Sequence, residues 1–163
     1  MPVQNSSALT VTLPSDLEIL MTREFDAPRR LVFEAMTKPE YVARWWGCSG
    51  STMPVCEMDF RVGGSWRFVL RMADGQEFGF HGVYQEIVPP EKVVSTECYE
   101  EPEFGNPEWL ATMRLEDLGE RTRMTTLVLH KSVEARNGHL QSGMEAGAGQ
   151  TFDRLAELLA SMR

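Results

Sequence analysis

Five polar residues in the middle of the chain could transfer protons or orient a ligand: Asp59, His81, Tyr84, Glu97 and Tyr99. Imidazole, carboxyl and phenol groups are common general acids and bases. However, strand parity places His81 and Tyr84 on opposite faces of a regular strand, unless a bulge occurs at Gly79 or Gly82. We therefore favour ordinary strand polarity over an active site, and keep His81 and Glu97 as candidate polar groups of a cavity.

Other catalytic and metal-binding chemistries find no support in the residue spacing. The chain has no Ser-His-Asp, paired-carboxylate or glycine-rich phosphate motif. Its histidines, His81, His130 and His139, lack metal-ligand spacing, and the acidic loop 100–108 does not match a calcium loop. We expect no catalytic residue, metal or cofactor. The loop is a solvated turn, which we favour, or a lid over a cavity that Phe104 and Trp109 would anchor.

The composition is typical of one globular domain with a net negative charge. The chain has 163 residues, of which 42% are hydrophobic, and a formal net charge of −8. This charge argues against a nucleic-acid partner, and no apolar run reaches the roughly 20 residues of a membrane span. The start of the chain lacks a secretion signal, and the odd set of cysteines contains no CxxC pair. We expect a cytoplasmic protein with reduced thiols.

The elements that would position these side chains begin with a strand and two helices. Residues 17–25 alternate as a strand. Asp26 and Pro28 suit the start of a helix, and Lys38, Pro39 and Glu40 start a second short helix that ends at Gly47.

A period of two begins at residue 55 and indicates an antiparallel meander. In residues 66–72, Trp66, Phe68 and Leu70 point to one face, whereas Arg67 and Arg71 point to the other. Residues 73–76 predict a hairpin turn, and further strands are expected at 78–88, 92–99, 109–118 and 121–130. The sheet therefore has one apolar and one wet face.

A long amphipathic helix closes the chain. Its apolar stripe is formed by Met144, Ala148, Phe152, Leu155, Leu159 and Met162. Because a glycine inside a helix costs roughly 1 kcal/mol, Gly143, Gly147 and Gly149 indicate a close approach. We expect packing at Gly143 and a pocket nearer Gly147 and Gly149. The fold class is α+β, with a flexible tail at 1–15 and one domain at 16–163.

Several local sequences, taken in order, resemble the SRPBCC (START/Bet v 1-like) superfamily. The closest resemblance is to its branch of homologues of the activator of the heat-shock protein 90 ATPase. It is carried by Arg23-Glu-Phe-Asp-Ala-Pro28, Trp45-Trp46, Asp59-Phe-Arg-Val-Gly-Gly64, Gly82-Val-Tyr84, Pro89-Pro-Glu-Lys-Val93 and Ser132-Val-Glu-Ala-Arg136. The resemblance implies a helix-grip fold, in which a curved antiparallel sheet of about six or seven strands wraps the C-terminal helix around a cavity.

We expect a cavity between the sheet and this helix to bind a small apolar or amphipathic molecule, such as a lipid. Its candidate wall is Trp45, Trp46, Trp66, Phe68, Met72, Phe80, Tyr84, Tyr99, Met113, Met144, Ala148, Phe152 and Leu155. We favour a binding protein over an enzyme. A hydrolase or cyclase-like enzyme and a chaperone-regulating partner, implied by the resemblance, stay open, as do monomer and homodimer.

Overall fold

The computed structural model describes residues 8–162. Its strands are β1 (Thr10–Thr12), β2 (Glu18–Phe25), β3 (Thr52–Met58), β4 (Ser65–Arg71), β5 (Glu77–Val88), β6 (Lys92–Tyr99), β7 (Glu108–Asp117) and β8 (Thr122–Leu129). Its helices are α1 (Arg29–Thr37), α2 (Pro39–Trp45), α3 (Val133–Gln141) and α4 (Met144–Ser161), with a 3₁₀ turn, η2 (Pro102–Phe104). Within residues 8–162, no helix has the length and apolar character needed to cross a membrane.

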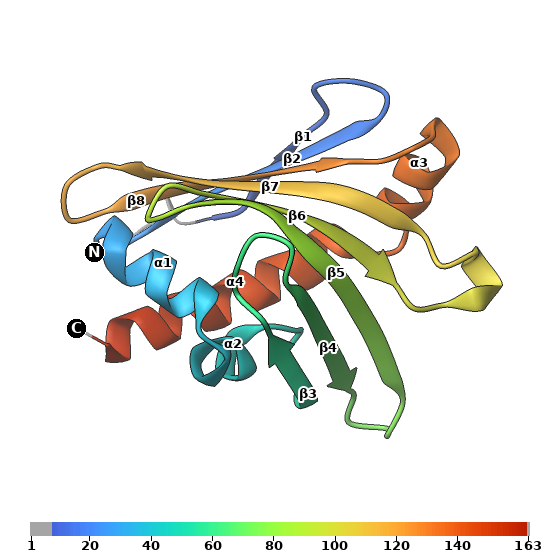
Figure 1. Cartoon of the computed structure of the whole chain (residues 1–163), viewed down its shortest axis with the longest axis horizontal. Helices are drawn as coiled ribbons and strands as arrows, with labels where there is room; N and C mark the ends of the chain where they lie inside the picture. The colour runs from blue at the N-terminus through green and yellow to red at the C-terminus, as the bar shows by residue number, and fades with distance from the viewer. Residues whose placement is uncertain (1–7, 163) are drawn as a thin grey trace.

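All strands form one antiparallel sheet in the order β1-β2-β8-β7-β6-β5-β4-β3. From β3 to β8 each strand pairs with the next along the chain, joined by turns and, between β6 and β7, by a longer loop that contains η2. The early strand β2 then pairs along its full length with β8, from Glu18 opposite Leu129 to Phe25 opposite Thr122. The sheet curves across α4, and α1 and α2 lie beside that helix (Figure 1).

The main core lies where α4 meets α1, α2 and the sheet. Phe152 of α4 contacts the rings of Phe25 and Trp45, with centroids 6.3 Å apart in each pair. Leu155 is fully buried one turn further along α4. Trp45 satisfies its indole N–H by donating to the backbone oxygen of Ala35 at 2.9 Å. The second half of α4 thus packs against α1, α2 and the sheet.

The architecture confirms the predicted helix-grip fold, with two differences. The first is the number of strands: the sheet has eight, because residues 10–12 form β1 and pair with β2 at Thr22, Met21 and Leu20. These residues were predicted within the flexible tail; residues 1–7 of that tail lie outside the described part of the chain.

The second difference is α3, which the sequence analysis does not anticipate. Its start is capped by Ser132, whose hydroxyl accepts a hydrogen bond from the backbone nitrogen of Ala135 at 3.0 Å. Buried Arg136 donates to the backbone oxygens of Ser15 and Glu18 at 2.8 and 3.2 Å. These bonds tie α3 to the start of β2.

Candidate ligand-binding site

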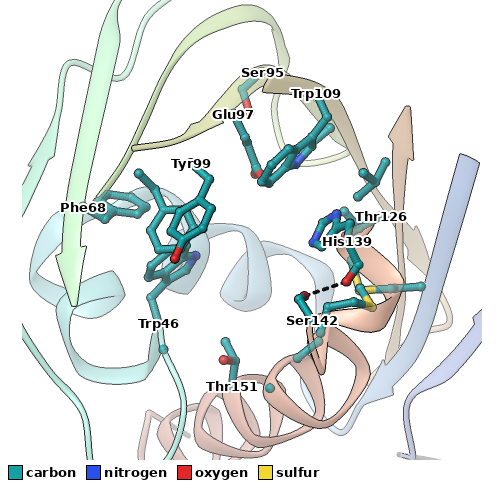
Figure 2. Close-up of a pocket in the computed structure, with 18 of the residues that line it drawn as sticks. Trp46, Phe68, Ser95, Glu97, Tyr99, Trp109, Thr126, His139, Ser142 and Thr151 are labelled. Carbon is teal, nitrogen blue, oxygen red and sulfur yellow. Dashed lines mark hydrogen bonds between the residues drawn. The ribbon is translucent and has the colours of Figure 1, made fainter. Parts of the chain in front are cut away.

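A cavity of about 1020 Å³ lies between the concave face of the sheet, α3 and the first half of α4. Its other walls come from β4 to β8, from α2 and the residues after it and from the loop before β7, with one methionine each from β2 and α1. The volume is at the upper end of the range for pockets that enclose drug-sized ligands. Figure 2 shows the rings of Trp46, Phe68 and Tyr99 on one side of the cavity, and Glu97, Trp109 and His139 on the other.

Aromatic rings from four segments form one end of the cavity. Phe68 on β4, Phe80 on β5 and Tyr99 on β6 are register partners, so their rings stand side by side on the concave face. The ring centroids of Phe80 and Tyr99 are 5.1 Å apart, and Trp46, just after α2, contacts Phe68 and Phe80 at 5.0 and 5.1 Å. Trp66 extends this cluster, at 4.7 Å from Phe68. This end offers broad, flat apolar surfaces.

The other end of the cavity carries the polar groups. Glu97 on β6 and Trp109 on β7 are register partners, and the Trp109 indole N–H donates to Glu97 Oε1 at 2.7 Å. Burial raises the pKa of Glu97, an effect that this hydrogen bond only partly offsets. Tyr84, on the neighbouring strand β5, also lines the cavity, and burial raises the pKa of its phenol. At this end of the cavity, the Glu97 carboxyl group and the Tyr84 phenol therefore favour their protonated, neutral forms.

Two histidines complete the polar end. His130 Nε2 lies 2.8 Å from His139 Nδ1, and the Trp109 ring lies 5.2 and 4.7 Å from the two imidazoles. Burial, together with the neighbouring His130, lowers the pKa of His139 to about 4. Burial and the charge of Arg136 also lower the pKa of His130. Both imidazoles are neutral at pH 7.

The hydrogen bond between the histidines fixes their tautomers. His130 Nδ1 is buried and has no hydrogen-bond partner within the described residues. A bare nitrogen lone pair there is less costly than an orphaned N–H. We therefore assign the shared proton to His130 Nε2, which donates to His139 Nδ1. His139 then carries its own proton on Nε2, the nitrogen left for a hydrogen bond from the cavity wall.

Most of the residues named as the candidate wall lie together around the cavity. They are Trp45, Trp46, Trp66, Phe68, Phe80, Tyr84, Tyr99, Met113, Met144, Ala148 and Phe152. The polar candidate Glu97 lies there too. Two candidates lie elsewhere: Met72 follows the end of β4 and contacts the Cys48 sulfur at 3.9 Å, and Leu155 is fully buried in the core.

His81 lies on the opposite face of the sheet from the cavity, so its assignment as a cavity group is wrong. Its register with β4 runs without a bulge from Gly79 to Val83, so parity holds and only Tyr84 points inward. His81 Nδ1 instead lies 2.7 Å from Glu100 Oε2. Arg67 and His81 hold the pKa of Glu100 below its ordinary value.

Asp59 also lies away from the cavity. Its carboxylate pairs with Arg61 at 2.9 Å in the turn before β4. At Gly64 a side chain would collide with the backbone oxygen of Asp59, so this glycine permits the tight turn. The segment 59–64 therefore has a structural explanation.

The glycines at the start of α4 differ from one another. Gly143 has φ +86° and joins α3 to α4 in the left-handed region, and a Cβ there would meet no atom within 4 Å. The expected close packing at Gly143 is therefore wrong. Gly147 lines the cavity, and its added Cβ would point into open space. Gly149 is equally free of contacts but does not line the cavity.

The loop between β6 and β7 lies at the edge of the cavity. It contains η2, and Phe104 and Pro107 both contribute to the cavity lining, although the Phe104 side chain is 68% exposed. The loop is thus largely solvated, with one aromatic ring at the rim. Among residues 8–162, no group of three or more His, Cys, Asp or Glu side chains is arranged to hold a metal ion.

The histidine pair is the part of the site that sequence reasoning missed. Met124, Thr126, Val128 and His130 share one parity on and after β8, which could have placed His130 on the inner face. No comparable signal existed for His139, since its position depends on α3.

The family described as Activator of Hsp90 ATPase homolog 1-like protein matches residues 26–160, which span the cavity walls and α4. The chain belongs to this family. Membership accounts for the fold and for the order of the elements around the cavity. Comparison with curated proteins finds no match.

Solved structures of bacterial proteins share the fold of this family member. A Rhodobacter sphaeroides protein is 24% identical with a TM-score of 0.87, over 94% of this chain and 99% of its own. A Mycobacterium smegmatis protein is 22% identical with a TM-score of 0.85, over 95% of this chain and 99% of its own. A Nitrosomonas europaea protein is 24% identical with a TM-score of 0.82, over 92% of this chain and 98% of its own. At these identities the similarity establishes the fold.

Proposed function

We propose that this protein binds a small apolar or amphipathic molecule in the cavity between the sheet and α4. The observation that carries the proposal is the cavity itself, about 1020 Å³ in volume and lined mainly by apolar side chains, many of them aromatic. Concave and mostly apolar pockets of this size are where proteins most often hold small molecules. A bound molecule would cover the apolar surface of the walls.

The walls suit an adaptable ligand. Methionines on four of the cavity-forming elements supply flexible and polarizable contacts beside the rigid rings: Met21, Met36, Met113 and Met144. The few polar groups gather at one end, which would orient an amphipathic molecule along the cavity. A lipid or an aromatic metabolite fits this description.

Ligand binding is tested by native mass spectrometry and thermal shift with a panel of lipids and aromatic metabolites. A ligand at 100 times its Kd stabilises the folded state by about 2.7 kcal/mol, which shifts Tm upward by several degrees. We expect at least one compound class to raise Tm and to appear as a one-to-one complex. Failure of every class would refute the proposal.

A second candidate function is an enzyme that uses the same cavity. Glu97 and His139 both line it, and both have pKa values displaced from their ordinary range. Such displaced pairs are typical of general acid–base sites. Incubation of an identified ligand with the native protein and with Glu97→Gln distinguishes the two functions. A change in the ligand's mass or chromatographic mobility with the native protein alone would favour catalysis.

The cellular setting belongs to the same proposal. Cys48, Cys56 and Cys98 are free thiols, as a reducing cytoplasm would maintain them. The cavity is built within one chain, so a monomer is sufficient for binding. Sedimentation of the purified protein tests the oligomeric state, and fractionation of cells tests the location.

A further inference from the structure

The cavity wall has an unbalanced charge. Among the described residues that line it there is no lysine and no arginine, whereas two carboxyl groups, Glu97 and Glu134, contribute. Glu134 lies in the first turn of α3 and is exposed at the rim. Glu97 is therefore the one acidic group of the cavity interior formed by residues 8–162.

Among residues 8–162, Glu97 has no compensating cation. Oε1 accepts the hydrogen bond from Trp109, which is the one hydrogen bond of this carboxyl group among the described residues, so Oε2 has no partner there. The nearby imidazoles of His130 and His139 are neutral at pH 7, so they do not supply the missing charge. A carboxylate in such a place is costly until a positive charge joins it.

One aromatic ring lies beside Glu97, and others lie across the cavity from it (Figure 2). The Trp109 ring stands beside the carboxyl group, and Figure 2 shows Tyr99, Phe68 and Trp46 across the cavity from it. The faces of such rings attract organic cations as well as apolar surfaces. An aromatic body would lie against these rings while a cationic group reached Glu97.

From these contacts we infer the class of ligand: an aromatic or polycyclic molecule that carries one basic nitrogen, with Glu97 as its counter-ion. This inference rests on the proposed ligand-binding function and narrows it. An anionic ligand, such as a fatty acid, would place its carboxylate in a cavity that has an acidic group and no described cation. A neutral ligand would leave Glu97 Oε2 without a charged partner.

Three fluorescent probes with one scaffold test the inference: 1-pyrenemethylamine, 1-pyrenemethanol and 1-pyrenecarboxylate. All four tryptophans of the chain line the cavity, so energy transfer from tryptophan to pyrene reports binding directly. Hydrogen bonds to charged groups are worth more than neutral ones. We expect the amine to bind the native protein at least about tenfold more tightly than the alcohol, and the carboxylate to bind most weakly.

Matched variants assign the preference to Glu97. Glu97→Gln keeps the shape and can still accept from Trp109, so it should fold with an unchanged or higher Tm. It should lower amine affinity to the level of the alcohol while alcohol affinity changes by less than about threefold. Glu134→Gln, the same substitution at the rim, should retain most of the preference because that carboxyl is exposed to solvent.

The outcomes separate this inference from the proposed function. Binding of the alcohol without a preference for the amine, or an amine preference that survives in Glu97→Gln, overturns the ligand class but keeps the binding function. Tighter binding of the carboxylate also overturns it. Binding of none of the three probes counts against the binding function and the ligand class together.

Discussion

The two halves of α4 lie in different surroundings, although they belong to one helix of 18 residues. Met144, Gly147, Ala148 and Thr151 in the first half border the cavity. In the second half the large aliphatic side chains are buried against α1, α2 and the sheet: Leu155, Leu158 and Leu159. Phe152 lies at the junction and contributes to both environments.

The difference between the halves is one of side-chain size. The sheet curves over the helix, and α1 and α2 lie beside it (Figure 1), so side chains must fill the space in between. Leucines fill that space in the second half, whereas glycine and alanine leave it open in the first. Stability and binding are therefore separable along α4, and substitutions in the two halves should have opposite consequences.

The largest expected effect follows from truncation in the second half. Leu155→Ala should lower the free energy of unfolding by about 2–5 kcal/mol, because it opens a void among fully buried neighbours. Met144→Ala, a comparable truncation beside the cavity, should cost less than about 1.5 kcal/mol, since Met144 is only half-buried. Urea unfolding measures both. Equal losses would contradict the division of α4 into a packed half and a cavity half.

The second prediction concerns the polar end of the cavity, next to the start of α4. The folded pKa of His139 is about 4, below its ordinary value of 6.5, so the unfolded chain binds the proton more readily. Stability contributed by this neutral imidazole is complete above pH 6.5 and is lost as pH falls toward 4. The loss is roughly 3 kcal/mol at most.

His139→Gln should therefore flatten the fall in stability between pH 6.5 and 4. Chemical unfolding at a series of pH values measures the difference between native and variant proteins. Between pH 7 and 8 the two curves should run parallel, because histidine is neutral there in both states. Parallel curves across the acidic range as well would show that the cavity end does not hold His139 neutral.

Much of the fold could be predicted because the strands alternate clearly. The strand expected at residues 92–99 coincides with β6, and the parity of Trp66 and Phe68 correctly placed them on the inner face. The alternation rule also predicted that His81 and Tyr84 point to opposite faces of one strand. In the structure Tyr84 faces the cavity and His81 does not. Periodicity thus predicted which side of a strand faces the helix.

The remaining features depend on contacts that periodicity does not encode. The three-residue strand β1 is too short for a pattern, and α3 has no apolar stripe that would predict a helix. His139 reaches the cavity only because α3 folds back toward the sheet, where it meets His130. Phe152 and Leu155 lie on the same predicted stripe, yet Phe152 borders the cavity whereas Leu155 is fully buried in the core.

The third prediction separates binding from stability in the first half of α4. Gly147→Leu should place an aliphatic side chain in the cavity and weaken binding of 1-pyrenemethanol at least about tenfold. Stability should hold or rise, because leucine favours helix by about 0.8 kcal/mol over glycine. Gly149→Leu is the matched control: its Cβ also meets open space, but Gly149 does not line the cavity. Equal binding by both variants would place the ligand elsewhere.

The smallest effects come from alanine at the three glycines, read by urea unfolding. Gly147→Ala and Gly149→Ala should each stabilise the protein by about 1 kcal/mol, because a Cβ meets nothing within 4 Å and helix propensity improves. Gly143→Ala meets equally open space, yet should destabilise by about 1 kcal/mol, because φ at that position is +86°. If all three variants gained stability, backbone conformation at Gly143 would not be what requires a glycine there. A gain in stability at Gly147 and Gly149, together with a loss at Gly143, would show that the two glycines inside the first half of α4 lower the stability of the protein. The packed second half carries no such glycine.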